Sequence, residues 1–252
     1  CIAFLSLLPF LPKAFKSVRK KHYLPIAIMA IFGNGIPAFL FTKAQTELSS
    51  SVVGILNALV PLFTLLLGIY FFKSRPSKTN IFGVLIALLG AVLLTFNTME
   101  GGVEINNYIY LVILATVFYA ISINIIKKYL YDLNASSITS LAFLIIGPVA
   151  AVYLFSTDFI NITDTNEKGY MALGYIALLS VVGTSVAVII FNNLINNSSA
   201  IFASSVTYLI PIVAILWGVF DGEQITELHL IAVSVILSGV YLVNKKKSAL
   251  SL

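Results

Sequence analysis

The chain has 252 residues, of which 59% are hydrophobic and only 10% are charged, and its mean hydropathy is +1.01. A soluble domain of this length does not need so much apolar surface, so the composition excludes an ordinary water-soluble protein. One cysteine excludes a disulfide framework, and two scattered histidines offer little for metal binding. We therefore expect an all-α integral membrane protein without a metal or cofactor.

Apolar stretches of about 18 to 24 residues alternate with short polar segments, which is the length that a helix needs to cross the hydrocarbon core. Residues 1–12 have the composition of the end of a further span. Because the chain begins at Cys1 without a methionine, we expect it to be an N-terminally truncated piece. The other spans are expected at residues 23–43, 50–72, 80–97, 107–127, 136–155, 170–191, 199–220 and 227–244.

The charges sort onto two sides when these spans are laid out alternately. One side receives 13 of the 15 basic residues, with Lys43 and Lys168 as the exceptions, and the other side receives nine of the ten acids. Because basic loops stay in the cytoplasm, we expect the basic loops and the C-terminus on the cytoplasmic side of a bacterial inner (plasma) membrane. There they set topology and contact lipid headgroups, so no nucleic-acid partner is expected.

The sequence repeats itself at an offset of 150 residues. The matched pairs are Gly33 with Gly183, Phe41 with Phe191, Pro61 with Pro211, and Gly68 with Gly218. An odd number of spans separates the matched segments, so the two halves thread the membrane in opposite directions. The following spans match one residue out of register, with Gly83 and Gly90 on Ala232 and Gly239, and this spacing keeps each small pair on one helix face.

Each half is expected to contain five spans, which gives a ten-span inverted-repeat helical bundle with nine spans visible and the first of these partial. Residues 1–98 would form the first repeat, lacking its first span and part of its second. Residues 105–247 would form the second repeat. Inverted repeats of this kind are typical of transporters, which build a solute site where the halves meet.

Three segments carry a resemblance to a known family. Residues 49–63 (SSSVVGILNALVPLF) and 200–213 (AIFASSVTYLIPIV) resemble the run of small residues followed by P-[LIV]-[FV] of EamA-type transporters. Residues 218–225 (GVFDGEQI) resemble that family's "lxGE" ending before its last span, whereas the first half has Phe72-Lys73 where Gly-Glu is usual. The resemblance covers essentially the whole chain and implies the drug/metabolite transporter superfamily.

Polar side chains deep in the spans are the candidate lining of a solute cavity, because apolar helices otherwise exclude them. The structural alternative for each is a contact that only joins helices, which contributes about 0.6 kcal/mol. Asn57 and Thr207 occupy matching positions, as do Asn34 and Thr184. The expected cavity residues are Asn34, Asn57, Tyr119, Asn124, Thr184, Ser204, Thr207 and Tyr208.

Prolines are the expected bending points of the bundle. Proline lacks a backbone donor, so Pro61 and Pro211 should free the carbonyls near Asn57 and Thr207, which is tolerated where they line a cavity. Lys43 either snorkels to the headgroups or attracts anions at the cavity mouth. The expected hinges are Pro37, Pro61, Pro148 and Pro211, with Gly33 and Gly183 beside them.

These features predict a secondary transporter that moves a small organic solute by alternating access. The resemblance implies an amino acid, a related metabolite or a drug-like compound as cargo, often exported. Few fixed charges in the spans favour a neutral or zwitterionic cargo. The alternative is a non-transporting membrane scaffold or a channel-like facilitator.

An intramembrane enzyme is not expected, because no acid lies deep in a span and both histidines lie at membrane edges. No carboxylate lies deep in a span, where it could relay protons. The sequence also lacks the GxxxxGK[ST] phosphate-binding loop that would indicate an ATP-driven pump. The expected partners are the lipid bilayer and the solute. Solute identity, transport direction, coupling ion and the choice between monomer and homodimer stay open.

Overall fold

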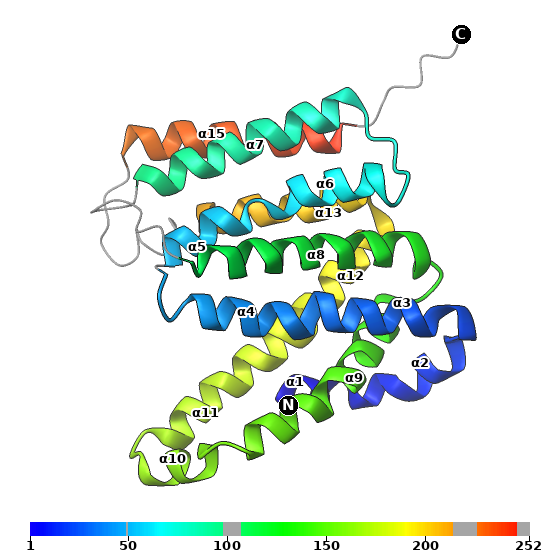
Figure 1. The fold of residues 1–252 in the computed structure, drawn as a ribbon, viewed down its shortest axis with the longest axis vertical. Coiled ribbons are helices and arrows are strands. Elements are labelled where there is room, and N and C mark those ends of the chain that lie inside the picture. Colours follow the sequence, from blue (N-terminus) through cyan, green and yellow to red (C-terminus); the bar gives the residue numbers. More distant parts are fainter. Residues whose placement is uncertain (49, 98–106, 214–225, 246–252) are drawn as a thin grey trace. The chain divides into compact units, whose positions relative to one another are not determined.

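The computed structural model describes residues 1–48, 50–97, 107–213 and 226–245, and these are helical without a strand (Figure 1). Residues 218–225, which carry the family-like ending, lie outside this part. Five described segments are long and apolar enough to cross a membrane: Lys20–Ala44, Ile109–Tyr129, Ala135–Phe155, Gly169–Asn197 and Glu227–Asn244. Shorter apolar helices are Val60–Tyr70, Lys78–Leu94 and Ala200–Val213. The expectation of an all-α membrane fold is confirmed.

One helix is longer than the span predicted for it from the sequence. The helix that begins at Gly169 continues to Asn197 instead of ending at residue 191. Its asparagines mimic a polar loop in the sequence, but two of their amide groups donate hydrogen bonds within unit 1. Asn192 Nδ2 donates to Thr139 Oγ1 at 2.9 Å, and Asn196 Nδ2 donates to the Leu133 carbonyl at 3.0 Å.

The chain divides into two compact units, each of which combines segments from both sequence repeats. Unit 1 contains residues 1–35 and 125–197, and unit 2 contains residues 36–124 and 198–252. Unit 1 is organised around α9 (Ala135–Phe155). This helix packs against four others, which are α1 (Ile2–Leu7), α2 (Leu11–Ser17), α3 (Lys20–Ala30) and α12 (Ala187–Asn197). The remaining elements of unit 1 are η1 (Leu8–Phe10), η2 (Ile31–Gly35), the end of α8 (Ile109–Tyr129), α10 (Phe159–Thr165), α11 (Gly169–Leu178) and η3 (Leu179–Val186).

Unit 2 is built on the pair α7 (Lys78–Asn97) and α15 (Glu227–Asn244), which lie side by side (Figure 1). Its other elements are α4 (Ile36–Ala44), α5 (Ser50–Asn57), α6 (Val60–Tyr70), most of α8 (Ile109–Tyr129), α13 (Ala200–Ser205) and η4 (Val206–Leu209), after which the chain is helical again at residues 210–213.

Glycines allow α7 and α15 to touch backbone to backbone. A Cβ atom built on Gly83 would lie 2.7 Å from the Gly239 carbonyl oxygen, and one on Gly90 would lie 3.1 Å from the Ala232 carbonyl oxygen. The repeat equates Gly83 with Ala232 and Gly90 with Gly239, so the two contacts exchange under the symmetry of the repeat. The helices are antiparallel, and the expected common face of the small residues is confirmed.

Phe72-Lys73, which stands where Gly-Glu is usual, lies just beyond the end of α6. Lys73 has a φ of 55°, and the Ser74 N–H donates to the Gly68 carbonyl at 2.8 Å. A left-handed conformation costs a non-glycine residue about 1–2 kcal/mol, so the helix here ends with some strain.

Candidate functional site

Two helical segments of unit 2 are broken at matching positions. α5 ends at Asn57 and α6 begins at Val60, while η4 interrupts the second segment and the helix resumes at Ile210. The offset of 150 residues equates Val60 with Ile210, and a proline follows each directly. Proline is tolerated in the first turn of a helix, where its missing N–H has no intrahelical partner. Pro61 and Pro211 thus mark the start of a second half-helix.

The carbonyl near Thr207, which Pro211 was expected to leave without a donor, accepts a hydrogen bond. The Ile210 N–H donates to the Thr207 carbonyl in the tighter turn of η4, so this part of the prediction is wrong. The physical reason is that a 3₁₀ turn supplies a donor three residues along where proline has removed the one four residues along.

The two breaks share one buried cluster with the α7–α15 pair. Ala58 and Tyr208, which match at the repeat offset, both belong to it, and Tyr208 is fully buried. The Tyr208 hydroxyl donates to the Val84 carbonyl of α7 at 3.2 Å. The other buried members are Ala87, Ala91, Leu94, Ala232 and Ile236. Tyr208 is therefore a core residue that anchors the break to α7.

Two further expected cavity residues are also buried and bonded. Ser204 is fully buried, and its hydroxyl donates to the Ile201 carbonyl at 2.9 Å. Asn124 of α8 is 4% exposed, and its Nδ2 donates to the Thr64 carbonyl of α6 at 3.1 Å and to the Ala120 carbonyl at 2.9 Å. Asn124 joins two helices, which is the structural alternative that the sequence left open, whereas the Ser204 hydroxyl bonds within its own helix.

Three expected residues of unit 2 are half-buried instead. Asn57 ends α5, and within the described part of the chain its side chain has no hydrogen-bond partner. Thr207 donates its hydroxyl to the Ser204 carbonyl at 2.9 Å. The Tyr119 ring stacks on Phe41 with ring centroids 5.7 Å apart. These three side chains are thus neither fully buried nor fully exposed.

The other two expected residues lie in unit 1, on π-helical turns that match in the repeat. Asn34 lies in η2 beside Gly33, and Thr184 lies in η3 beside Gly183. Asn34 Nδ2 makes only a long contact of 3.9 Å to Met29 Sδ. Turns of π-helix are uncommon and often occur at functional sites.

The remaining expected hinges differ from one another. Pro37 follows η2 directly, at the second residue of α4, whereas Pro148 lies within α9, which is helical without interruption.

A shallow groove of about 400 Å³ on α7 and α15 does not belong to this set. The hydroxyls of Ser234 and Ser238 on its wall donate to carbonyls of their own helix at 2.8 and 2.7 Å. The groove therefore has no polar group in need of a ligand. Its lining is Ile86, Leu230, Ile231, Ser234, Val235 and Ser238.

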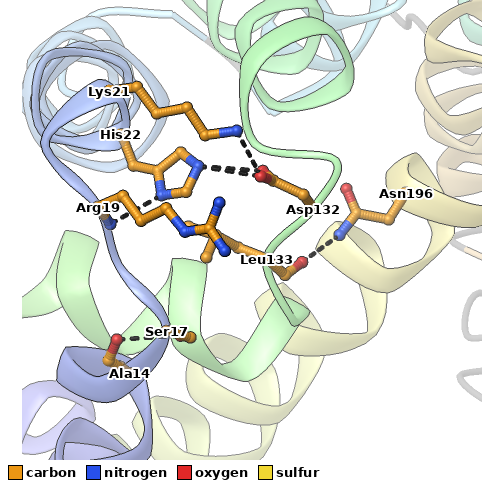
Figure 2. A network of polar contacts seen from close by, with 8 residues as sticks. All are labelled: Ala14, Ser17, Arg19, Lys21, His22, Asp132, Leu133 and Asn196. Atoms are coloured by element: carbon orange, nitrogen blue, oxygen red, sulfur yellow. Dashed lines mark hydrogen bonds and ion pairs between the residues drawn. The ribbon is translucent and has the colours of Figure 1, made fainter.

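A polar network that was not predicted from the sequence lies in unit 1, at the start of α3 (Figure 2). Asp132, in the connection from α8 to α9, accepts from Lys21 Nζ at 2.6 Å on Oδ2. His22 Nε2 lies 3.3 Å from the same oxygen and 3.0 Å from Oδ1. The hydrogen bond from Lys21 holds the pKa of the Asp132 carboxyl below its ordinary value. Asp132 is the one acid that falls on the same side as the 13 basic residues when the spans are laid out alternately. This exception was the signal in the sequence that pointed to an ion pair.

Comparisons with known proteins show to which family the chain belongs. The EamA-like transporter family matches residues 1–96 and 106–245. This chain belongs to the EamA-like transporter family. A similar relative of this EamA-like protein is an uncharacterized transporter of Archaeoglobus fulgidus, 26% identical over 234 residues, which are 92% of this chain and 81% of the relative.

The uncharacterized inner membrane transporter YedA of Escherichia coli K12 is 27% identical over 231 residues, covering 87% of the EamA-like chain and 69% of YedA. A protein of known crystal structure shares the fold, with a TM-score of 0.65 at 14% identity and coverage of 96% and 93% of the two chains. The EamA-like protein is thus an integral membrane protein of a transporter family.

Proposed function

We propose that this EamA-like transporter is a secondary carrier that moves a small organic solute by alternating access. The observation that carries the proposal is the pair of helix breaks after Asn57 and at Val206–Leu209, which match in an inverted repeat. Discontinuous helices near the membrane midplane are where secondary transporters bind their substrates. A scaffold or a channel has no need of breaks that correspond in the two halves.

The solute contacts would come from the half-buried polar groups beside the breaks. Asn57 and Thr207 supply an amide and a hydroxyl from the two halves, and Tyr119 supplies an aromatic edge. None of these groups is charged, so the cavity suits a neutral or zwitterionic solute. An amino acid, a related metabolite or a drug-like compound fits this chemistry, with export as the direction.

The matched π-helical turns would provide the bending points within unit 1. A π-helical turn shifts the hydrogen-bond register, so the helix on either side can rotate at small cost. In this scheme Gly33, Gly183 and Pro37 permit the motion, while α7 and α15 stay together as a rigid pair. The basic loops and the C-terminus would face the cytoplasm of a bacterial inner membrane.

Counterflow in liposomes that contain the full-length protein tests the proposal. Vesicles are loaded with a pool of amino acids and nucleosides, and the accumulation of labelled tracers is followed for the unmodified protein, Asn57→Ala and Thr207→Ala. Uptake of one tracer that both substitutions weaken supports a carrier with its site at the breaks. Uptake that neither substitution changes supports a carrier and rejects this site. A tracer flux that never exceeds equilibration would indicate a channel-like facilitator instead.

A further inference from the structure

The side chain of His22 caps the first turn of α3. The Arg19 N–H donates to His22 Nδ1 at 3.1 Å, and the His22 N–H donates to the Arg19 carbonyl at 2.9 Å. This is the geometry of a capping box, in which the third helical residue accepts from the residue that precedes the helix. The His22 side chain is only 1% exposed.

These contacts fix where the imidazole carries its proton. A backbone N–H can only donate, so Nδ1 must present its lone pair and Nε2 must carry the hydrogen. That hydrogen is donated to the Asp132 carboxylate, whose Oδ2 lies 3.3 Å and Oδ1 3.0 Å from Nε2 (Figure 2). His22 is therefore held as the neutral Nε2–H form, with both ring nitrogens engaged.

A second proton on this ring is incompatible with the cap. It would enter at Nδ1, where it would meet the Arg19 N–H, so two donors would face each other and the hydrogen bond would break. The imidazolium formed would remain beside the Asp132 carboxylate. Histidine is the side chain that ordinarily gains a proton between about pH 5 and 8.

We propose that His22 is a proton-binding switch of the carrier: a proton taken from water onto Nδ1 breaks the Arg19 cap and loosens the first turn of α3. α3 is the first part of the Lys20–Ala44 span, which continues into the π-helical turn η2, so the switch would couple transport to the pH on the cytoplasmic side. This inference rests on the carrier function and the topology proposed above.

The surrounding charges support a switch whose partner does not titrate with it. Asp132 is already paired with Lys21, so it stays ionised across the range in which histidine titrates. Lys127 of α8 donates to the Asn196 carbonyl at 2.9 Å. The first two turns of α9, the helix packed against α3, carry no titratable group. The other cationic residues close to the cap in sequence are Lys16, Arg19 and Lys20.

The chain offers its own control at the start of α15. There the Thr226 N–H donates to His229 Nδ1 at 3.0 Å, which repeats the cap. This cap has a threonine as the N-cap residue, and the Thr226 hydroxyl contacts the same ring nitrogen and accepts from the His229 N–H. A proton on His229 Nδ1 would also break the bond from the Thr226 N–H, but the Thr226 hydroxyl can reverse and accept from the protonated Nδ1. The α15 cap can therefore replace the lost bond, whereas the Arg19 cap shows no such hydroxyl.

Hydrogen exchange of the purified full-length protein tests the switch without any transported solute. The peptide covering residues 17–23 is compared at pH 7.5 and 5.5 between the unmodified protein and His22→Gln. Glutamine at this position keeps the cap and does not titrate. Loss of one hydrogen bond worth about 0.5–1.5 kcal/mol predicts exchange about 2- to 12-fold faster than in His22→Gln at pH 5.5, and equal exchange at pH 7.5.

The matched variant His229→Gln should leave residues 17–23 unchanged at both pH values. Equal exchange of the unmodified protein and His22→Gln at pH 5.5 would overturn the switch, whatever the carrier does. If exchange responds but counterflow has the same dependence on internal pH in the unmodified protein and in His22→Gln, coupling to transport is overturned. If counterflow itself is absent, the proposed carrier function fails while the exchange result still stands.

Discussion

Unit 2 contains two pairs of segments that the same repeat relates, and they behave in opposite ways. α7 and α15 are continuous helices that touch at backbone distance through Gly83, Gly90 and Gly239. The α5–α6 and α13–η4 segments are broken near their prolines and leave Asn57 and Thr207 half-buried. Glycines spaced along one face favour close, rigid packing, whereas proline preceded by polar residues ends one half-helix and starts another.

The comparison implies that the two pairs of segments have different roles, although the same repeat relates both. The close pair should carry stability, because any atom added to it must push backbones apart. The broken pair should carry transport, because its polar groups are only partly occupied by neighbours. Substitutions in the two pairs should therefore have separable effects.

The largest effect is expected from Gly239→Ala in the close pair. The added Cβ would lie 2.4 Å from the Ala87 nitrogen, a backbone atom that cannot rotate away. We expect a loss of about 1–3 kcal/mol of stability, measured as a lower thermal midpoint in detergent by size-exclusion chromatography. Gly54→Ala is the matched control, because no atom lies within 4 Å of its added Cβ. An unchanged midpoint for Gly239→Ala would show that the pair is not rigid.

A smaller effect, on transport instead of stability, is expected from Thr207→Ala in the broken pair. Loss of one hydrogen bond to the solute should raise the KM of counterflow about 2- to 12-fold, with the thermal midpoint nearly unchanged. Ser204→Ala, one turn earlier and fully buried, should leave KM unchanged. Equal effects of the two substitutions would remove the distinction between half-buried and buried hydroxyls.

Asn124→Leu should destabilise the contact between α8 and α6. Its amide donates to carbonyls on both helices, and such contacts in membranes contribute about 0.6 kcal/mol and at most about 1.7 kcal/mol. The thermal midpoint should fall modestly while KM stays constant. A raised KM with a normal midpoint would return Asn124 to the cavity wall.

Tyr208→Phe removes a single hydroxyl that donates to the Val84 carbonyl and leaves the ring in its cluster. We expect a loss of about 0.5–1.5 kcal/mol, seen in the thermal midpoint. A defect in solute binding without loss of stability would contradict the assignment of Tyr208 to the core.

The smallest effect is expected from Asp132→Asn, outside unit 2. Because folding lowers the pKa of Asp132, its contribution to stability is present above the ordinary carboxyl pKa of about 3.9 and is lost as pH falls through the lowered value. The variant should be slightly less stable than the unmodified protein at pH 7 and equally stable in strong acid. A difference that persists in strong acid would point to a packing defect.

The sequence located most of the fold because its signals are local and periodic. Apolar length placed the spans, and the equal spacing of Gly83, Gly90 and Gly239 with their matches predicted the close face. The prolines predicted bending points in the spans 50–72 and 199–220, but not that the helices are interrupted just before Pro61 and Pro211. The 3₁₀ turn η4 was not predictable, because it depends on which donors remain once a helix is interrupted.

The candidate site was only partly predictable, since composition does not say which side of a helix faces a neighbour. Asn57 and Asn124 look alike in the sequence, yet one is half-buried and the other bonds two helices. The pairing of His22 with Asp132 joins residues 110 positions apart, and no periodicity reports such a contact.

Thiol labelling tests the central claim that the two breaks line a cavity open to each side in turn. Asn57→Cys and Thr207→Cys are made in a protein in which the native Cys1 is replaced by serine, with Ser204→Cys as the buried control. A membrane-impermeant maleimide is then applied from either side of oriented vesicles. We expect both positions to react from both sides and Ser204→Cys to stay unlabelled. Reaction at both positions from one side only, or at neither, would contradict alternating access at the breaks.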